Sequence, residues 1–305
     1  MYDSVCRFDA HDEDPEFSRL RLAPRTGQRP GGTGRLKPDP IPPHVEQASV
    51  DYTTVTEMPG IGASHEQLAR LYTRYAVAAS LCVEKDVLEV ACGAGPGLGY
   101  LASKAARVVG GDYTQELLRV ARRHYGARIS LLRLDAEALP FRSGVFDIVI
   151  LYEAIYYLKD ADEFVRESRR LLRPSGILLV CTVNPEWSDF NPSPFSRTYF
   201  SARDLRGLLA RHGFNVEIQL AFPVVRDSLR RRVVSLIKRV AVATGAMPRT
   251  MNGKRLFKRV FFGSLAPIPA EVVEGMATAC PLVSVTGDSR APDHKIIFAT
   301  GRKAG

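Results

Sequence analysis

A glycine-rich turn after an apolar segment is the stretch of this chain best suited to chemistry. Residues 87–99 read V-L-E-V-A-C-G-A-G-P-G-L-G, so a run typical of a buried parallel strand carries one acid, Glu89, and then breaks into four glycines at alternating positions. A helix-compatible segment, Leu98–Ala106, follows. Bare backbone N–H groups and a helix N-terminus would therefore lie beside the ligand, which favours a nucleotide-like molecule.

A second acid lies at a spacing that suits an adenosine. Asp112 ends the predicted strand Arg107–Asp112 and lies 19 positions beyond Gly93. In nucleotide-binding α/β folds, a carboxylate about 20 residues on accepts hydrogen bonds from ribose hydroxyls, and a carboxylate can accept two at once. The alternative is that Asp112 caps the helix predicted over Tyr113–His124.

The glycine spacing argues against a dinucleotide fingerprint. A G-x-G-x-x-G pattern that began at Gly93 would need glycine where Leu98 stands, and one that began at Gly95 would need it where Tyr100 stands. A looser variant from Gly97 lies inside the predicted helix. A nicotinamide oxidoreductase is therefore disfavoured.

Apolar runs alternate with amphipathic segments along most of the chain. Further strands are predicted over Ile129–Leu134, Phe146–Tyr152, Ile177–Val183, Phe214–Phe222 and His294–Arg302, and helices over Ser64–Leu81, Asp160–Leu172 and Ser201–His212. Ser64 and Gln67 make a capping box for the first of these helices. The alternation predicts an α/β fold with a doubly wound, mostly parallel sheet of seven strands and an antiparallel last strand.

The glycine turn resembles the first motif of class I S-adenosylmethionine (SAM)-dependent methyltransferases, acidic-x-Gly-x-Gly-x-Gly. Glu89, Gly93 and Gly95 match it, whereas Ala91 stands at the first glycine, which we expect to be tolerated if φ there is negative. The segment D-A-E-A-L-P-F over 135–141 is similar to the family's adenine-binding segment. L-L-R-P-S-G-I-L over 171–178 is similar to its helix–Pro–Gly–strand transition. The resemblance covers about residues 64–222.

The resemblance implies SAM as cofactor, S-adenosylhomocysteine as its product, and no metal. In the family, the acid at the position of Asp135 accepts the adenine amino group and the next backbone N–H, here that of Ala136, meets a ring nitrogen. The cofactor-binding residues that we predict are Glu89, Ala91, Gly93, Gly95, Asp112, Tyr113, Asp135, Ala136 and Glu153. The resemblance also implies a leading helix that closes over the cofactor, so Tyr72 and Tyr75 are either lid residues or core side chains.

The acceptor side is predicted from two segments. Glu153, Tyr156 and Tyr157 follow Phe146–Tyr152, whose end faces the methyl group in related enzymes, and they are the candidates for catalysis. A general base is needed only if the nucleophile is a hydroxyl, and Glu153 would serve as one unless it is simply a helix-start acid. The long loop Asn184–Phe200 supplies Trp187, Asp189 and Arg197 as substrate-binding candidates suited to a sugar or an aromatic ring.

Composition limits the alternatives. The 305 residues are 45% hydrophobic, yet no run of about 18 apolar residues predicts a membrane span, and the first residues do not resemble a secretory signal. Five cysteines lie far apart without a C-x-x-C pair, which favours a reducing cytoplasm over a disulfide framework or a zinc site.

Charge divides the chain unevenly. Residues 226–262 hold eleven Lys and Arg against one acid, while the whole chain has a net charge of +9, so the remainder is nearly neutral. We predict a disordered or loosely attached tail (1–50), a methyltransferase core (51–222), a basic helical insert (223–293) and the last core strand (294–305). The helix that opens the insert carries apolar residues from Leu229 to Val240 at helical spacing opposite a basic face.

The sequence thus predicts a SAM-dependent methyltransferase of a small molecule or biosynthetic intermediate. It resembles quinone C-methyltransferases and, more narrowly, methyltransferases of glycan biosynthesis, and O-methylation of a sugar or lipid-linked intermediate is the preferred expectation. The basic segment 226–262 would place the protein in the cytoplasm, peripherally at an anionic membrane surface. The alternatives are an RNA or other nucleic-acid methyltransferase or binding protein that uses this segment, a basic helix that only covers the core, and SAM binding without catalysis.

Overall fold

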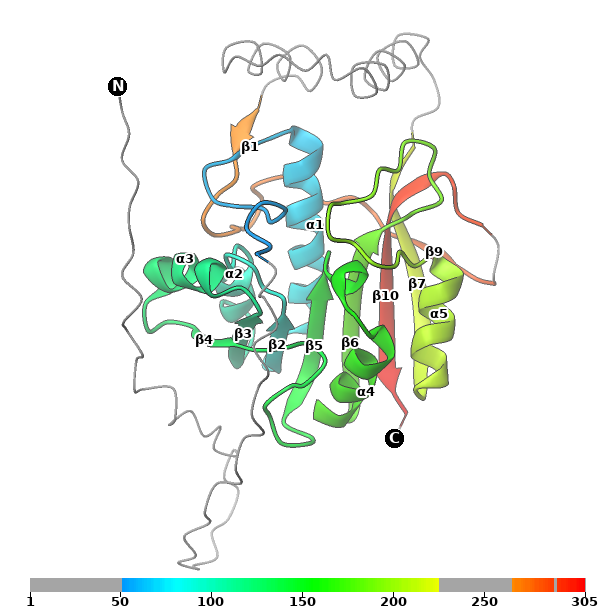
Figure 1. Cartoon of the computed structure of the whole chain (residues 1–305), viewed down its shortest axis with the longest axis horizontal. Helices are drawn as coiled ribbons and strands as arrows, with labels where there is room; N and C mark the ends of the chain where they lie inside the picture. Colours follow the sequence, from blue (N-terminus) through cyan, green and yellow to red (C-terminus); the bar gives the residue numbers. More distant parts are fainter. Residues whose placement is uncertain (1–50, 225–264, 288–289, 305) are drawn as a thin grey trace, which may run out of the picture. The chain divides into compact units, whose positions relative to one another are not determined.

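The computed structural model of the protein describes residues 51–224, 265–287 and 290–304. Within these residues an eight-stranded sheet has the strand order β4-β3-β2-β5-β6-β10-β7-β9, and a second sheet pairs β1 with β8 (Figure 1). The strands are β1 (Gly62–Ala63), β2 (Asp86–Val90), β3 (Arg107–Asp112), β4 (Ser130–Arg133), β5 (Phe146–Tyr152), β6 (Leu172–Val183), β7 (Phe214–Pro223), β8 (Ala266–Pro267), β9 (Val283–Val285) and β10 (His294–Lys303). The helices are α1 (His65–Leu81), α2 (Leu98–Ala102), α3 (Gln115–Tyr125), α4 (Ala161–Leu171) and α5 (Ala202–Arg211), with a 3-10 turn, η2, over Ile155–Tyr157.

The larger sheet confirms the predicted doubly wound architecture. Neighbouring strands from β4 to β6 run parallel, and β10 lies antiparallel between β6 and β7. Ile297 of β10 pairs with Thr182 on one side and with Leu220 on the other. The predicted number of seven strands is one too few for the described residues, because β9 pairs with β7 as an eighth strand at the sheet edge.

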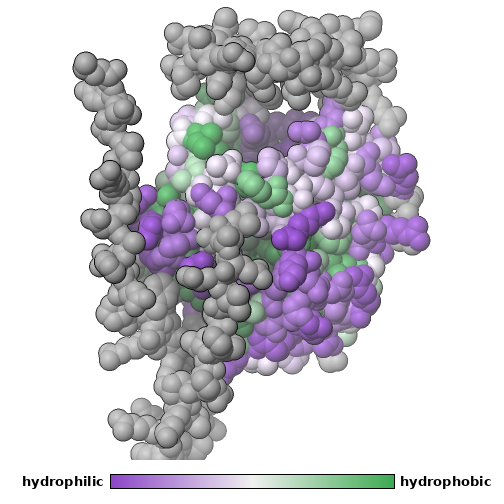
Figure 2. All heavy atoms as spheres, in the orientation of Figure 1, coloured by the Kyte–Doolittle hydropathy of each residue, from purple (hydrophilic) through white to green (hydrophobic). Residues whose placement is uncertain are grey.

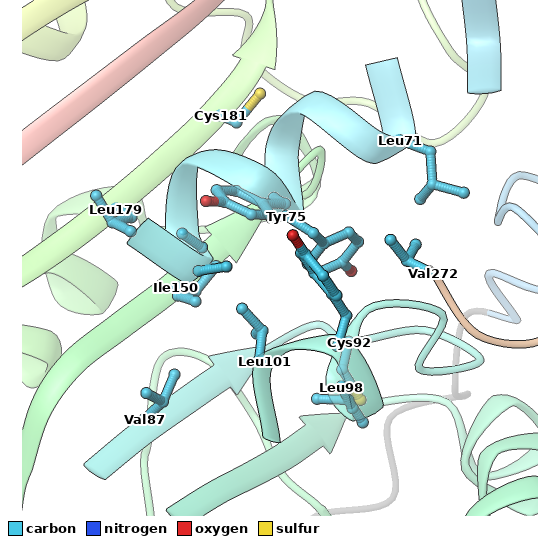
Figure 3. Close-up of a cluster of buried hydrophobic side chains, with 14 of the residues drawn as sticks. Leu71, Tyr75, Val87, Cys92, Leu98, Leu101, Ile150, Leu179, Cys181 and Val272 are labelled. Carbon is cyan, nitrogen blue, oxygen red and sulfur yellow. The ribbon is translucent and has the colours of Figure 1, made fainter. Parts of the chain in front are cut away.

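Helices cover both faces of the sheet, so the central strand β5 is apolar on both sides. Ile148 and Ile150 belong to the cluster of buried side chains that α1, α2 and α3 share with the strands, and Figure 3 shows Ile150 beside Leu101. Val149 and Leu151 are also buried and point to the opposite face, where α4 and α5 lie (Figure 1). The outer surface around α4 is hydrophilic (Figure 2), as expected for a helix with one buried face.

The ends of two helices follow from local hydrogen bonds. The predicted capping box of α1 is confirmed, since Gln67 N donates to Ser64 Oγ at 3.3 Å and Ser64 N donates to Gln67 Oε1 at 2.9 Å. The helix predicted over Leu98–Ala106 ends earlier, at Ala102. The last residues of the predicted helix lead into β3 instead. Ala106 N donates to Lys85 O at 3.0 Å, which places the start of β3 beside β2.

The described part of the predicted insert, residues 265–287, contains the strands β8 and β9 where a helical segment was expected. Ile268 N donates to Ile61 O at 2.9 Å, so this segment pairs with the residues that lead into α1. Val272 is buried, and its N–H donates to Pro96 O at 2.7 Å in the glycine turn. Residues 265–276 therefore form a strap across the outside of the turn.

The predicted tail 1–50 and the basic helix predicted from Leu229 to Val240 lie outside the described residues. The same is true of the whole segment 226–262, on which the predicted membrane or nucleic-acid partner depends. In the portion that is described, none of the helices has the length and apolar character needed to cross a membrane.

Candidate active site

A cavity of about 440 Å³ opens at the carboxyl ends of the parallel strands. This is the edge at which doubly wound sheets bind ligands, because the strand-to-helix loops gather there. The predicted site residues that line it are Glu89, Ala91, Gly93, Asp112, Tyr113, Asp135, Ala136, Glu153, Tyr156, Tyr157 and Arg197. The fold thus brings together side chains from the ends of four strands and from the loop after β6.

The glycine turn after β2 has a left-handed backbone at three positions. The φ angles of Ala91, Gly93 and Gly95 are 56°, 60° and 76°. The condition under which we expected Ala91 to be tolerated, a negative φ, is therefore not met, and the alanine lies where the family motif has glycine. An L-residue in this region costs about 1–2 kcal/mol, because its Cβ crowds the following carbonyl oxygen. Of these three positions, Ala91 is the one that carries a side chain, so the strain falls on Ala91.

Gly93 and Gly95 have different surroundings. A Cβ on Gly93 would lie 2.9 Å from Thr56 Cγ2, so the turn is closely covered by the segment that precedes α1. Gly95 does not line the cavity; its carbonyl oxygen accepts a hydrogen bond of 2.7 Å from the Tyr125 hydroxyl. Gly95 therefore holds the turn against α3, whereas Gly93 presents backbone to the ligand space.

Glu89 brings a buried carboxyl group to the floor of the cavity. Its Oε1 accepts a hydrogen bond of 2.7 Å from the Tyr75 hydroxyl, while the buried Oε2 has no partner among the described residues. Burial raises the pKa of Glu89 to about 7. A buried carboxylate oxygen without a donor favours a ligand with a positive charge or a hydrogen-bond donor at this point.

Asp112 ties the end of β3 to the glycine turn. One carboxylate oxygen accepts from Gly93 N at 2.8 Å and the other from Thr114 N at 2.8 Å. The residue at the N-cap of α3 is Thr114, so the alternative role of Asp112 as that cap residue is not what the structure has. Burial raises the pKa of Asp112, and each oxygen keeps a lone pair for a ligand hydroxyl.

The segment after β4 lines the same side of the cavity. Asp135 Oδ1 accepts a hydrogen bond of 2.9 Å from Glu137 N, which shapes a tight turn. Ala136 is buried beside it, and Tyr113 follows Asp112. These residues have the donors and acceptors that an adenine ring and a ribose require.

Glu153 also lines the cavity and comes directly after β5. Its backbone is left-handed, with φ at 52°, and Glu153 N donates to Cys181 O at 2.8 Å. Glu153 Oε1 lies 3.8 Å from Arg74 Nη1, and the Tyr156 hydroxyl donates to Oε2 at 3.3 Å. Burial raises the pKa of Glu153, and the positive charge of Arg74 opposes that rise.

Aromatic rings form a wall next to Glu153. The ring centroids of Tyr156 and Tyr157 are 4.5 Å apart, and Tyr52 packs on Tyr157 at 5.2 Å. Tyr199 from the loop after β6 stacks on Tyr156 at 4.9 Å. The wall combines segments before α1, after β5 and after β6, so it is formed by tertiary packing.

The three predicted substrate-binding residues do not meet at one place. Arg197 lines the cavity, and its N–H donates to Tyr156 O at 2.7 Å. Trp187 and Asp189 do not line it. The Trp187 ring instead lies beneath Lys295 of β10, whose Nζ is 5.5 Å from the ring centroid. The start of the loop is therefore held against the sheet, and only its later part reaches the cavity.

The sequence prediction missed the residues that α1 and its leading segment contribute. Tyr75 of the predicted leading helix lines the cavity, whereas Tyr72 bonds Glu274 of the strap instead. The unpredicted residues that line the cavity from this part of the chain are Tyr52, Val55, Thr56, Glu57, Gln67, Arg70 and Arg74. Arg74 is almost fully buried and forms ion pairs with Glu57 and Glu153. Gln67, Arg70 and Arg74 are spaced three and four positions apart, so they lie on one helix face, and this spacing could have predicted a polar face toward the cavity.

The described residues contain no group of three His, Cys, Asp or Glu side chains placed to hold a metal ion.

Comparisons with known proteins agree on one family. Residues 88–180 match the family model described as a methyltransferase domain. Over 182 residues, the chain is 31% identical to a protein of Mycolicibacterium smegmatis named "Probable S-adenosylmethionine-dependent methyltransferase", and the match covers 58% of this chain and 70% of that protein. The matches to two Mycobacterium tuberculosis proteins with similar names cover 65% of the length of those proteins.

Two further matches are more distant. The chain is 26% identical over 165 residues to a ubiquinone biosynthesis O-methyltransferase of Bartonella tribocorum, covering 48% of this chain and 67% of that protein. The crystal structure of a SAM-dependent methyltransferase from Thermotoga maritima superposes with a TM-score of 0.50 at 15% identity, over 77% of this chain and 91% of that one. At this identity the superposition is similarity of fold.

Proposed function

Because the chain belongs to the class I SAM-dependent methyltransferases, we propose that it transfers the methyl group of SAM to a hydroxyl group of a small-molecule acceptor, a sugar or a lipid-linked intermediate. SAM supplies a methyl group on a sulfonium, which is a good leaving group in an in-line displacement. The protein's main task is therefore to hold the acceptor oxygen close to that carbon and aligned with it, which can be worth about 7–11 kcal/mol.

The residues at the cofactor side have the chemistry that SAM needs. The unpartnered oxygen of Glu89 suits a positively charged or N–H-bearing part of the cofactor, and the free lone pairs of Asp112 suit ribose hydroxyls. Asp135 and Ala136 would hold the adenine. A side chain at Gly93 would meet Thr56, so glycine lets this segment pack against the turn.

The observation that carries the choice of a hydroxyl acceptor is the half-buried carboxyl group of Glu153, which lines the same cavity. A hydroxyl must lose its proton as its oxygen attacks, and a carboxylate whose pKa is raised is a better base than an exposed one. Arg74 lies 3.8 Å from Glu153, and its positive charge favours the ionised carboxylate against the effect of burial. Tyr156 orients it by a hydrogen bond to Oε2.

The aromatic wall supports an acceptor with an apolar or ring-shaped body. Tyr52 and Tyr157 offer ring faces on which a sugar or an aromatic ring can pack, with hydroxyl groups for its polar edge. The similarity to a ubiquinone biosynthesis O-methyltransferase supports oxygen as the methylated atom. No described feature favours a nucleic acid or a membrane surface as partner, and both stay predictions from residues 226–262, as does a cytoplasmic location.

The variant Glu153→Gln tests this proposal. It keeps the size of the side chain and removes the base, so kcat with labelled SAM and an acceptor fraction should fall by about 10²–10⁴, while the Kd for SAM changes little. The matched control is Glu116→Gln, the same change on the exposed surface of α3, which should leave kcat unaltered. An undiminished kcat in Glu153→Gln would rule out Glu153 as the base and remove the support for a hydroxyl acceptor.

A further inference from the structure

Most charged side chains that line the cavity form an ion pair or a hydrogen bond with another residue. Glu57 and Glu153 share Arg74, and Arg70 pairs with Glu66 at 2.5 Å. Asp112 accepts two backbone N–H groups. The acids of the inner cavity thus have either a protein partner or a role toward the cationic cofactor.

Two cations that line the cavity form no ion pair within the described part of the chain. Lys159 and Arg197 line the cavity, and neither forms an ion pair with any residue that the structure describes. They come from different segments, Lys159 from the end of the turn after β5 and Arg197 from the loop after β6. Both carry exposed side chains, so they stand at the rim.

Hydrogen bonds fix the backbones of both residues. Arg197 N donates to Tyr156 O at 2.7 Å, and Lys159 N donates to Glu137 Oε1 at 2.6 Å. Burial raises the pKa of Tyr52; the positive charge of Arg197 opposes this rise, and Tyr113, Asp112 and Glu137 add to it. Arg197 is therefore held beside the aromatic wall, and Lys159 is held beside the segment that follows β4.

Unpaired cations at this rim suit a negatively charged group. A guanidinium offers a planar fork of N–H donors that fits a phosphate or a carboxylate, and an ammonium adds a point charge. The cofactor carries a sulfonium, and its predicted contacts are mainly with acids, so the rim cations have no evident role toward its positive charge. Two positive charges also raise the local concentration of an anionic substrate.

We propose that the acceptor carries an anionic oxygen group, a phosphate ester or a carboxylate, close to the hydroxyl that is methylated, and that Lys159 and Arg197 bind this group. The inference rests on the proposed function and narrows its substrate class. Neutral sugars and neutral lipids would then be poor acceptors. The negative charge of Glu153 faces the hydroxyl, while the rim cations face the anionic group, so the two determine the orientation of the acceptor.

The test begins with the full-length protein, methyl-labelled SAM and an extract of the source organism separated on an anion exchanger. Label should appear in material that the exchanger retains and salt releases. Phosphatase treatment of the labelled product then separates the two chemistries, because loss of retention indicates a phosphate ester and unchanged retention indicates a carboxylate.

Variants of Lys159 and Arg197 test whether these two residues bind the anionic acceptor. Arg197→Ala and Lys159→Ala should each raise the KM for the retained fraction about tenfold with little change in kcat, as expected for the loss of one charge-assisted hydrogen bond. Arg197→Lys should recover part of the loss. The matched control is Arg203→Ala, which removes an exposed arginine of α5 that does not line the cavity.

The outcomes separate this inference from the proposed function. Labelling of a hydroxyl compound that is not retained, with an unchanged KM in the double variant, would overturn the inference and leave the proposed function standing. A weaker Kd for SAM in Arg197→Ala would assign the cation to the cofactor's carboxylate and also overturn it. Failure to transfer label to any fraction would contradict the proposed function, and this inference with it.

Discussion

Replacement of Glu89 by Gln should change how the stability of the protein depends on pH. Glu89 is 1% exposed, one of its oxygens accepts from Tyr75, and the other has no partner among the described residues. Burial therefore disfavours its ionised form and raises the pKa to about 7 from 4.5. Gln fills the same space and accepts the same Tyr75 hydrogen bond, but it does not titrate.

The sign and size of the effect follow from proton linkage. A carboxyl group whose pKa is higher in the folded chain stabilises the fold fully below the unfolded value of 4.5, and this contribution is lost as the pH rises to about 7. The full loss is about 3 kcal/mol at about 1.4 kcal/mol per pKa unit, of which about 2.5 kcal/mol falls between pH 5 and pH 8. Any cost of the unpaired amide in Glu89→Gln is independent of pH, so it cancels.

The assay is urea unfolding of wild type and Glu89→Gln without SAM at pH 5 and pH 8. The difference in unfolding free energy between the two proteins should move by about 2.5 kcal/mol in favour of the variant as the pH rises. The Kd of the wild type for SAM should fall over the same range, because a positively charged ligand favours the ionised carboxylate. A parallel pH dependence in the two proteins would refute the account of Glu89 as a buried, uncompensated acid.

Three further results are expected. Asp112→Asn should weaken SAM binding by about 10- to 100-fold in calorimetry, because it removes the negative charge from the hydrogen bonds to the ribose. Unchanged affinity would remove the ribose assignment. Asp112→Ala should also destabilise the turn, because the N–H groups of Gly93 and Thr114 would lose their acceptor. Ala91→Gly should raise the unfolding free energy by about 0.5–1 kcal/mol in the same urea assay, because relief of the left-handed strain exceeds the added chain entropy, and a less stable variant would contradict this. Deletion of residues 226–262 should reduce co-sedimentation with anionic vesicles, because it removes a net charge of +10, and equal co-sedimentation of both forms would contradict a membrane role.

The sequence predicted most of the residues that line the cavity at the ends of β2, β3 and β4, because the signals for them are local. A strand that ends in a glycine turn determines where Glu89 and Gly93 point, and Asp112 ends the next strand in the sheet. The strand ends then come together by the pairing of β2 with β3 and β5. Gly95 was predicted to bind the cofactor but does not line the cavity, and the φ of Ala91 is positive, which a single alanine in the sequence does not reveal.

The acceptor side was predicted less well because it is made by packing between distant segments. Arg74 meets Glu153 across 79 positions of the chain, and no spacing rule predicts such a pair. Tyr52 joins the aromatic wall from the segment before α1, for which the sequence predicted no site residue. The composition of its loop predicted Trp187 as a substrate contact, but Lys295 of the last strand lies over the Trp187 ring instead.

A crystal structure with S-adenosylhomocysteine would test the central claim most directly. The account predicts the ribose hydroxyls at Asp112, the adenine at Asp135 and Ala136, and the sulfur directed toward Glu153 and Tyr156 in the same cavity. Binding of the molecule at another surface, or with its sulfur turned away from Glu153, would contradict the assignment of this cavity as the site of methyl transfer.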